Sequence, residues 1–456
     1  MSRLSDILWE YDPQFQAPLT RLREATSLAL MVVAVWTMVR RLAVRLLEEV
    51  LTGRAHQPET WPVCSSCGRR LQSKGFRERV LHTLFGVIRW QRRVGRCPHG
   101  CAGSQVAPLD QALGLLPHQR TGAEVQWMGC LLAVFVPYET ACRLLQQLTG
   151  VSLAAGTIWT WVQQVGQRVM AQLADEVKAL AAGTLPRAES VAAELVALPL
   201  VIGADGVMVP FRPQPGTPKG TTRWREIKVA ILARVGERLT RQGKGVTRLC
   251  QRRLVAVLGT IDDLTPRLWL EAVRQGVSTA VQVVWLSDGG RGFWTVFQRC
   301  FKAVGATAIL DFYHAAQNLY KGIAAWLDGR TCACQQRFAQ LCHQLRHGHE
   351  QPVLAELAAL VESAQLPESA RETLTNVYNY LKTHEDHIQY DQFKTAGLPI
   401  GSGMVESACK WLVQQRFKGV GMRWSEPGFD PLLHLRLAWV NQRFDSFFPA
   451  MIPSPN

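Results

Sequence analysis

The stretch with the most chemistry lies near the C-terminus and reads LPIGSGMVESACKWLVQQRFKGVGMRW, from Leu398 to Trp424. Pro399 and two glycines around Ser402 have the composition of a loop that starts a helix. Glu406 falls early in that helix, and the cationic residues that follow are Lys410, Arg416, Lys418 and Arg423. One carboxylate at the start of a basic helix suggests a metal ligand that faces a polyanion. The alternative is a first-turn acid that the helix dipole favours.

Two aspartates stand where predicted strands end. Asp205 lies late in the first strand of a β-rich region, and Asp288 directly follows the fourth strand. The expected order is three strands, helix, strand, helix, strand, an α/β core that starts as an antiparallel meander and ends with crossover connections. The strands are expected at 194–209, 224–235, 253–261, 280–286 and 306–310. In a sheet of this order the first and fourth strands are neighbours, so the two aspartates would converge.

Three carboxylates that point at one place repel each other unless a cation neutralises them. Oxygen ligands of this kind favour Mg²⁺ or Mn²⁺. Two such ions activate a water or a 3′-hydroxyl and stabilise the leaving oxygen of a phosphodiester. The alternative for Asp205 and Asp288 is a turn, because each precedes a glycine. Asp262, Asp263 and Asp311 are competing acids at strand ends.

Four cysteines between residues 58 and 105 have the spacing of a zinc ribbon. They form two pairs, Cys64 with Cys67 and Cys97 with Cys101. The intervening segment 76–96 alternates apolar and basic residues around a turn and predicts a β-hairpin. We expect the four thiolates to hold a structural Zn²⁺. His99 in place of Cys101, or four unrelated reduced thiols, remain open as alternatives.

The expected ribbon is cationic, with nine basic residues and one acid from Arg69 to Arg96. This charge fits contact with phosphates. The ribbon residues that we expect to contact DNA are Arg69, Arg70, Lys74, Arg92 and Arg93.

A helix-turn-helix pattern follows the cysteines. Helices are expected at 124–135, 138–148 and 154–169, with a tight glycine turn at Gly150. In this motif the later helix enters the major groove by its N-terminal residues, here Thr157, Thr160 and Gln163. The alternative is an ordinary helical hairpin.

Composition limits the classes of function. The 456 residues carry a net charge of +15, with 47% hydrophobic and 19% charged residues, which is typical of a globular protein with a polyanionic partner such as nucleic acid. The longest apolar run, 28–39, is too short to span a bilayer. Twelve cysteines without a signal peptide favour a reducing cytoplasm.

The chain is expected to form a multidomain α/β protein. The predicted parts are an N-terminal helical segment (1–55), zinc ribbon (56–107), helix-turn-helix region (118–182), core (191–314), helical insertion (315–397), final core helices (398–445) and tail (446–456). One long helix is expected at about 20–51, explained by core packing or self-association. In the insertion, His343 and His347 are four residues apart on a helix, but no knuckle pair accompanies them.

Five segments together resemble the DDE transposases with an RNase H-like fold, most closely those of ISKra-type insertion sequences. The segments are ADG around Asp205, WREIKVAIL from Trp224, WLSDGG around Asp288, LDFYHAAQNLY from Leu310 and GSGMVESACKWLVQQRFKGVGMRWS. They span roughly residues 204–441, and the last is the most specific. The cysteine ribbon and the helix-turn-helix region also fit this family.

The resemblance implies that Asp205, Asp288 and Glu406 are catalytic metal ligands. Asp311 and His314 match a D-x-x-H signature and would support the site. The residues implied to contact DNA near Glu406 are Lys410, Arg416, Lys418, Arg423 and Trp424, with core packing as the alternative for Trp424.

The implied function is transposition. The protein would bind the terminal inverted repeats of its element, cleave a strand with Mg²⁺ or Mn²⁺ and join the 3′-hydroxyl to target DNA. The expected partners are double-stranded DNA and a second copy of the chain in the DNA complex, near the nucleoid of a prokaryotic cytoplasm. The alternative is a non-catalytic DNA-binding regulator that retains the fold.

Overall fold

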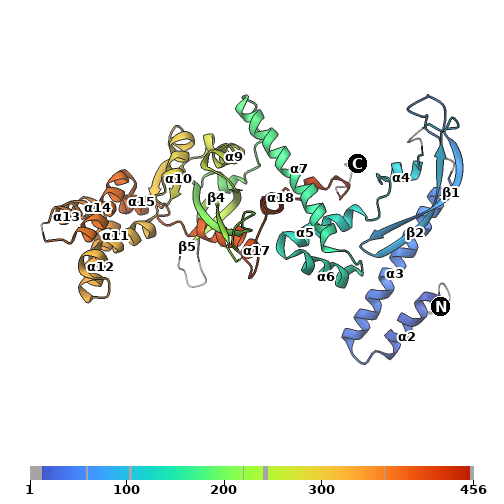
Figure 1. Cartoon of the computed structure of the whole chain (residues 1–456), viewed down its shortest axis with the longest axis horizontal. Coiled ribbons are helices and arrows are strands. Elements are labelled where there is room, and N and C mark those ends of the chain that lie inside the picture. The colour runs from blue at the N-terminus through green and yellow to red at the C-terminus, as the bar shows by residue number, and fades with distance from the viewer. Residues whose placement is uncertain are drawn as a thin grey trace. The chain divides into compact units, whose positions relative to one another are not determined.

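The computed structural model describes residues 13–57, 60–101, 105–218, 220–239, 245–363 and 365–451. The chain divides into two compact units, one of Met1–Val162 with Asp445–Asn456 and the other of Gln163–Phe444. The predicted tail is described as far as residue 451, and the first twelve residues of the predicted N-terminal segment lie outside the described part. Figure 1 labels the helices and strands.

The first unit contains helices and one hairpin. Its elements are η1 (Pro13–Phe15), α2 (Gln16–Glu24), α3 (Leu28–Ala55), β1 (Gln72–Thr83), β2 (Gly86–Arg96), α4 (Pro108–Ala112), α5 (Ala123–Phe135), α6 (Tyr138–Thr149), η6 (Asp445–Phe447) and η7 (Pro449–Met451), and α7 (Ala155–Ala181) runs on into the second unit.

The prediction of one helix over 20–51 was wrong, because the chain breaks between α2 and α3. Ser27 has an extended backbone, and its hydroxyl accepts a hydrogen bond from Leu30 N–H at 3.3 Å, which caps the start of α3. Phe15 and Leu19 of the α2 side pack against Met38 of α3. These contacts cover only one side of α3.

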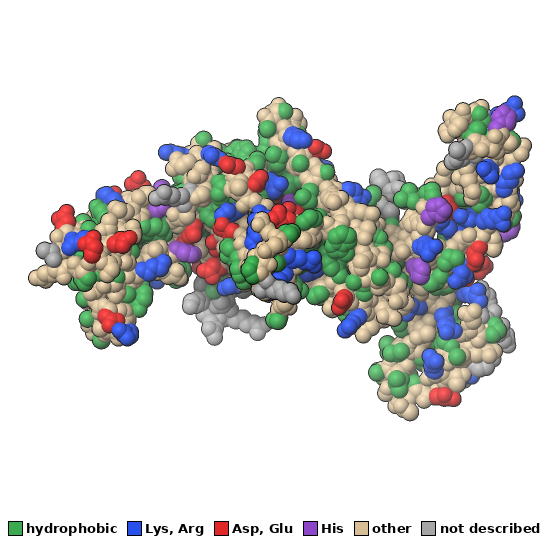
Figure 2. All heavy atoms as spheres, viewed as in Figure 1, with side chains coloured by type: hydrophobic (Ala, Val, Ile, Leu, Met, Phe, Trp, Pro, Cys, Tyr) green, Lys and Arg blue, Asp and Glu red, His purple; other side chains and the backbone are tan. Residues whose placement is uncertain are grey.

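The hairpin expected between the cysteine pairs is confirmed. β1 and β2 pair antiparallel from Gln72 opposite Arg96 to Thr83 opposite Gly86, with a register shift between Ser73 and Phe76. Its inner side packs Leu81, Ile88 and Trp90 against the end of α3. Figure 2 shows many Lys and Arg side chains over this hairpin on the visible face.

The second unit contains a five-stranded mixed sheet followed by helices. The sheet and its crossovers comprise α8 (Ala193–Val196), β3 (Leu200–Phe211), β4 (Arg223–Leu239), β5 (Gly245–Val257), α9 (Ile261–Arg274), η2 (Val277–Thr279), β6 (Val283–Ser287), α10 (Arg291–Val296), η3 (Phe297–Phe301) and β7 (Thr307–Leu310). The strand order is β5-β4-β3-β6-β7. β3, β4 and β5 are antiparallel to their neighbours in the meander, whereas β6 and β7 run parallel to β3. The expected meander with crossovers is confirmed.

The strand boundaries differ most from the predicted ones at the starts of the first and third strands. The first strand begins at Leu200 rather than at 194, because the short helix α8 occupies 193–196. The third strand begins at Gly245, eight residues before its predicted start at 253, because β5 pairs with the far end of β4 as well. The alternation of apolar and polar residues along one strand does not show how long its pairing with the neighbouring strand is.

The helices after β7 form two groups. The insertion consists of α11 (Phe312–Leu327), α12 (Cys332–Arg346), α13 (Glu350–Glu362), α14 (Glu368–Thr383), η4 (Glu385–His387) and α15 (Tyr390–Thr395), which lie together as a bundle in Figure 1. The final group is α16 (Gly403–Ala408), the π-helical segment η5 (Cys409–Gln414), α17 (Gln415–Phe417) and α18 (Glu426–Val440). No described helix has the length and apolarity that a bilayer crossing requires.

One apolar core joins the sheet to the insertion. Trp285 of β6 is fully buried and stacks on Phe301 at a centroid distance of 5.2 Å. The same cluster continues into the insertion through Leu319, Leu374 and other residues of α11 and α14. The insertion is therefore packed against the sheet and is not a detached appendage.

Candidate active site and metal centre

Asp205 and Asp288 lie next to each other where β6 ends. In the parallel register of β3 and β6, Ala204 pairs with Ser287, the last residue of β6. The next residue on β3 is Asp205, and the next residue after β6 is Asp288. The predicted adjacency of the first and fourth strands is confirmed. This register brings two partly buried aspartates to one place on the sheet.

The loop after β6 is held by its own hydrogen bonds. The Asp288 carboxylate accepts a hydrogen bond from Gly290 N–H at 3.1 Å. The Asp288 carbonyl accepts one from the Trp294 indole N–H at 2.7 Å and is also 3.1 Å from the Ser287 hydroxyl. Because both the carboxylate and the backbone have partners, the loop has a defined conformation despite its two glycines.

Glu406 is delivered by a helix that lies directly on β3. A Cβ added at Gly203 would be 2.3 Å from Val405 Cγ2 and 3.0 Å from Met404 Cε, so only glycine permits this approach. Val405 is fully buried against the strand. Glu406, the next residue, keeps about half of its side chain exposed and lies 3.5 Å from the Lys410 ammonium. The helix that carries Glu406 therefore contacts β3 at Gly203, two residues before Asp205.

Asp311 connects three elements that surround these acids. It ends β7, begins α11 as the N-cap and is 1% exposed. Its Oδ1 accepts a hydrogen bond from His314 N–H at 2.8 Å, and its Oδ2 accepts one from Ser402 N–H in the loop before α16. Burial raises the pKa of Asp311, but the hydrogen bonds from His314 and Ser402 outweigh burial and hold the pKa at about 2. Asp311 is therefore an ionised tie between the sheet and the loop that carries Glu406.

His314 faces the two aspartates from α11. Its Nδ1 lies 3.2 Å from Asp311 Oδ1, and this contact is the main reason why the pKa of His314 is raised. Burial lowers this pKa, whereas the charges of Asp288 and Asp205 raise it. The His314 imidazole therefore lies beside a set of carboxylates that favour its protonated form.

The three predicted ligands share one electrostatic environment. Burial is the largest influence on Asp205 and raises its pKa, and the charges of Asp288 and Glu406 raise it further. The Gly206 N–H and the nearby His314 act in the opposite direction. In the part of the chain that the structure describes, however, only the four cysteines place three or more ligand atoms within 4.8 Å of one another. The carboxylates are neighbours without forming a closed ligand set.

The competing acids have other roles. Asp263 accepts hydrogen bonds from Thr260 N–H at 2.8 Å and from its hydroxyl at 2.9 Å, in a capping box at the start of α9. Asp262 is 76% exposed and pairs with Arg299. Both acids therefore serve the start of α9 and its surface.

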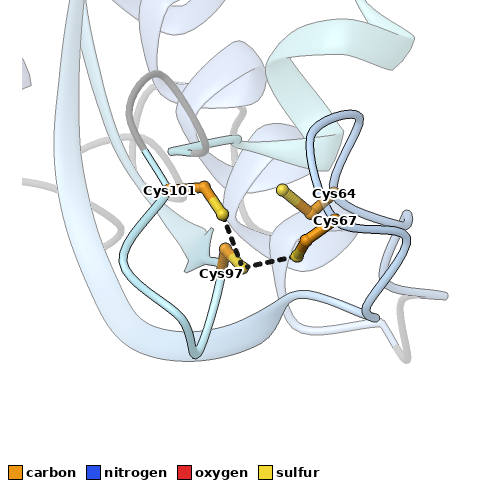
Figure 3. A group of neighbouring side chains, drawn as sticks. All are labelled: Cys64, Cys67, Cys97 and Cys101. Atoms are coloured by element: carbon orange, nitrogen blue, oxygen red, sulfur yellow. Dashed lines mark hydrogen bonds between the residues drawn. The ribbon is translucent and has the colours of Figure 1, made fainter.

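The four cysteines converge as expected (Figure 3). Cys67 Sγ lies 3.4 Å from Cys97 Sγ, which lies 3.8 Å from Cys101 Sγ. A Zn–S distance of about 2.3 Å gives sulfur atoms about 3.8 Å apart in a tetrahedron. The separation in the structure fits this geometry. Cys101, and not the alternative His99, belongs to the group.

The backbone prepares one thiol of this cluster for metal binding. Backbone N–H groups of Ser66 and Cys67 lower the pKa of Cys64 to about 7. The neighbouring sulfurs, Cys67 first, raise the pKa of Cys101 to about 12. Four thiols of which one ionises readily and another resists ionisation need a cation to ionise together. This donor set could hold a structural Zn²⁺.

Several residues expected to contact DNA are engaged inside the protein. Arg92 donates from Nε to Asp110 at 2.8 Å and from Nη1 to the Arg77 carbonyl at 3.0 Å, so its guanidinium supports the hairpin. Arg93 lies over the Phe76 ring at 5.3 Å. Arg69, Arg70 and Lys74 are exposed. The expectation for Arg92 is corrected, because a guanidinium with these partners is not free for a phosphate.

Arg416 is buried and Trp424 is half-buried. Arg416 is 2% exposed and lies over the Trp424 ring at 5.4 Å. The Trp424 indole donates to the Phe417 carbonyl at 2.9 Å and packs edge-on against Phe417. Trp424 also pairs with the end of β3 as an isolated bridge to Phe211. The core-packing alternative therefore applies to Trp424, and Arg416 does not reach the surface.

The other residues of the second unit that were predicted to contact DNA are exposed. Lys410 and Lys418 are exposed, and Lys418 lies over the Trp224 ring at 5.5 Å. Arg423 is exposed and contacts the Gly220 and Thr221 carbonyls at 3.4 Å. Lys418 and Arg423 flank the fully exposed Val420 in the loop between α17 and α18, whereas Lys410 lies in η5.

A helix, α7, begins where the recognition helix was predicted. α5 and α6 match the expected bounds closely, and Gly150 ends α6 in the left-handed conformation at φ 75°. α7 begins at Ala155, close to its expected start, but runs to Ala181, twelve residues beyond its predicted end at 169. Thr160 is exposed on α7, and Thr157 is half-buried. Gln163 is half-buried, and its amide nitrogen is buried without a hydrogen-bond partner among the described residues. Gln163 is thus the weakest of the three as a base contact.

Three site neighbours were missed from the sequence. Ser402 was interpreted only as part of a loop, although its N–H binds Asp311. Trp294 holds the Asp288 carbonyl, and Tyr380 of α14 lies against Gly289. No sequence period identifies such contacts between distant elements. In the insertion, His343 and His347 lie with ring centroids 4.3 Å apart, but no third ligand joins them in the described part.

Loss of one cysteine should release the metal. We expect Cys97→Ser to lower the zinc content of the purified chain from about one per chain to well below half, because three ligands bind far more weakly than a closed tetrahedral set. Cys332→Ser, which alters an exposed cysteine outside the cluster, should keep the full content. Atomic emission after dialysis measures zinc. Unchanged zinc in Cys97→Ser would contradict the assignment.

Loss of the Asp311 carboxylate should cost stability in a pH-dependent way. Its folded pKa of about 2 lies below its ordinary value of 3.8, so its contribution is full above about pH 4 and is lost as pH falls through about 2. We expect Asp311→Asn to lower the free energy of unfolding by about 2 kcal/mol at pH 7 and by little near pH 2. Urea unfolding followed by tryptophan fluorescence measures this, with the exposed Asp262→Asn as control. An equal loss at both pH values would refute it.

The sequence matches no family model. It is similar to a Streptococcus gallolyticus protein described as "UPF0236 protein in vanSb 3'region", with 23% identity over 372 residues that cover 81% of this chain and 74% of that protein. Among solved structures, "Drosophila P element transposase strand transfer complex" aligns over 75% of this chain and 82% of that chain, with 10% identity and a TM-score of 0.25. A TM-score this low does not show a common fold.

Proposed function

We propose that the chain is a DDE-type DNA transposase. It binds the terminal inverted repeats of its insertion sequence, cleaves a strand in a metal-dependent reaction and joins the exposed 3′-hydroxyl to target DNA. The ISKra-type motifs in the sequence motivate this assignment. The same proposal places the protein with the DNA of a prokaryotic cytoplasm.

The observation that carries the proposal is the meeting of Asp205, Asp288 and the Glu406 helix. Asp205 directly follows Ala204 on β3, and Asp288 directly follows Ser287 on β6. Ala204 and Ser287 lie opposite each other in the parallel register of these strands. Glu406 comes from a helix that lies on Gly203 of β3. The charges of Asp288 and Glu406, which lie 83 and 201 positions after Asp205 in the sequence, both raise the pKa of Asp205. Such a cluster, beside the end of the inner strand β6, is a candidate for catalysis.

The sheet topology supports an RNase H-like core. Counted in chain order, its five strands lie as 3-2-1-4-5, with an antiparallel meander and two parallel strands. An insertion between the last strand and the helix of the third acid leaves this core intact. A fold does not determine a substrate by itself, so the choice of DNA depends on the motifs and on the charge.

The chemistry of the acidic residues fits a hard divalent cation. Three carboxylates supply oxygen ligands, and burial together with their mutual repulsion raises the pKa of Asp205. Asp205, Asp288 and Glu406 would hold two Mg²⁺ or Mn²⁺ ions, which supply activation of a water or 3′-hydroxyl and stabilisation of the leaving oxygen. Asp311 keeps the Glu406 loop against the sheet, and Asp311, followed by the charges of Asp288 and Asp205, raises the pKa of His314 beside the carboxylates.

The remaining parts would bind DNA. In this proposal the exposed Arg69, Arg70 and Lys74 near the cysteine cluster and the exposed Lys418 and Arg423 near α17 contact phosphates. Thr160, exposed near the start of α7, reads base edges in the major groove. A net charge of +15 supports a polyanionic partner.

A non-catalytic DNA-binding regulator is the second candidate. The observation that favours it is that the three carboxylates form no closed ligand set, while Glu406 lies near Lys410. Cleavage assays separate the two functions.

Removal of the carboxylate of Asp205 or of Glu406 should abolish strand cleavage. We expect Asp205→Ala and Glu406→Gln to lower strand cleavage of the DNA flanking the gene by about a thousandfold or more, because several kcal/mol of charge stabilisation are lost. Gel-shift binding of the same DNA should stay unchanged. Glu372→Gln, at an exposed acid of α14, is the control. Full cleavage by either variant would exclude the DDE assignment, and binding without cleavage by the wild type would favour the regulator.

The proposal includes two copies of the chain in the DNA complex. One face of α3 carries Leu28, Val32, Val35 and Val39, which are 76%, 59%, 42% and 50% exposed. These positions follow the helical period, and the segment 28–39 contains no charge. An uncharged stripe is complementary to itself in a two-fold pair and offers nothing to a charged partner. We assign a second copy of α3 to this stripe.

Charges placed on the stripe should separate the two copies. We expect Val35→Glu with Val39→Glu to halve the mass of the protein–DNA complex in analytical ultracentrifugation while single-end binding persists, because burying carboxylates in an apolar contact is costly. Ala29→Glu, exposed but outside the stripe, should leave the mass unchanged. A double variant that still forms the two-copy complex would remove α3 from the interface.

A further inference from the structure

The loop that carries Asp288 is in direct contact with the helical insertion. A Cβ added at Gly289 would lie 1.9 Å from Tyr380 Cε2 and 2.6 Å from Tyr380 Cζ. Tyr380 belongs to α14 of the insertion, 91 residues further along the chain. Residue 289 must therefore be glycine because the tyrosine ring occupies the space of a side chain. The ring packs on the peptide that follows Asp288.

A second contact holds the same loop from its other end. The Trp294 indole N–H donates to the Asp288 carbonyl at 2.7 Å. The Trp294 ring lies with its centroid 4.5 Å from His387, nearly parallel at 24°, and 4.5 Å from His384. Both histidines follow α14, in and before η4. The insertion therefore contacts the Asp288 loop directly through Tyr380 and indirectly through Trp294.

These contacts add to the hydrogen bonds within the loop. Gly289 and Gly290 have no side chains to restrict the backbone, and within the loop Asp288 accepts hydrogen bonds from Gly290 N–H through its carboxylate and from the Ser287 hydroxyl through its carbonyl. The position of Asp288 relative to Asp205 also depends on the ring of Tyr380 and on the indole of Trp294. Packing of the insertion on the sheet supplies both restraints.

We infer that Tyr380 is a positioning residue for Asp288, and that α14 thereby controls divalent-metal binding at the carboxylates. This inference rests on the proposed function. The aromatic ring does the positioning, since it fills the space that a side chain at residue 289 would occupy. An insertion that shifts when DNA binds would, through the same contact, change the affinity of the site for metal.

The experiment uses the zinc-loaded full chain and Mn²⁺ as the probe. Binding is measured by loss of the free Mn²⁺ signal in electron paramagnetic resonance, and strand cleavage of the DNA flanking the gene is measured against Mn²⁺ concentration. We expect Tyr380→Ala to weaken Mn²⁺ binding about tenfold or more, as substitutions of residues that orient metal ligands do. Saturating Mn²⁺ should restore most of the cleavage rate. Tyr380→Phe should behave as the wild type.

Gly289→Ala supplies a complementary test. Its methyl group overlaps the Tyr380 ring, so it should weaken Mn²⁺ binding by a similar factor. In the double variant with Tyr380→Ala the overlap is gone, and the loss should match that of Tyr380→Ala alone and not the product of the two. Tyr378→Ala is the control, because residue 378 lies two positions away and faces another side of α14. If Gly289→Ala does not fold, the Tyr380 pair alone decides.

The outcomes separate this inference from the proposed function. Wild-type protein that binds no Mn²⁺ and cleaves no DNA would overturn both. Wild-type protein that binds Mn²⁺, together with unchanged affinity in Tyr380→Ala, would overturn the positioning role only. A variant that loses maximal cleavage rate but keeps its Mn²⁺ affinity would also overturn it, because that result indicates a structural defect and not a displaced ligand.

Discussion

The parallel register between β3 and β6 is the constraint on which the candidate site depends. Ala204 pairs with Ser287, so the two strands reach their aspartates at the same level of the sheet. A slip of one residue would turn one of the aspartates to the opposite face. The register is fixed by burial, since all five residues of β6 are buried and cannot slide without moving apolar side chains into other environments. A core-packing requirement thus sets the distance between two carboxylates.

Glu406, the third acid, is positioned through the residues that fix its loop and its helix. Asp311 stays ionised while 1% exposed because it accepts hydrogen bonds from His314 and Ser402, and it thereby fixes the loop that starts α16. Gly203 allows that helix to lie on β3. Glu406 itself remains about half exposed. The supporting residues are therefore more firmly held than the acid they deliver, which is compatible with a ligand set that closes only around a cation.

The cysteine cluster and the acidic cluster illustrate two different relations between ligands and fold. The hairpin module packs few residues into its own small core, so four sulfur ligands and a bound metal would contribute a large part of its stability. The acidic cluster belongs to a sheet with a large core of its own. Its carboxylates can remain apart without a cation because the sheet does not need them to fold.

The sequence by itself determined the features that depend on neighbours along the chain. The cysteine pairs, the hairpin between them, the strand order and the place of Asp288 after β6 follow from local spacing and period. Asp205, predicted late in the first strand, lies in the middle of β3 because that strand runs on to Phe211. Tertiary structure decided which side chains are accessible. Arg416 lies in the same basic stretch as Lys418, yet it is buried, and Trp424 is half-buried, because both pack in an aromatic cluster with Phe417. Tertiary structure also decided the roles of Ser402, Trp294 and Tyr380, whose partners are 6 to 91 residues away. Such contacts arise from packing between elements, and no pattern within one element records them.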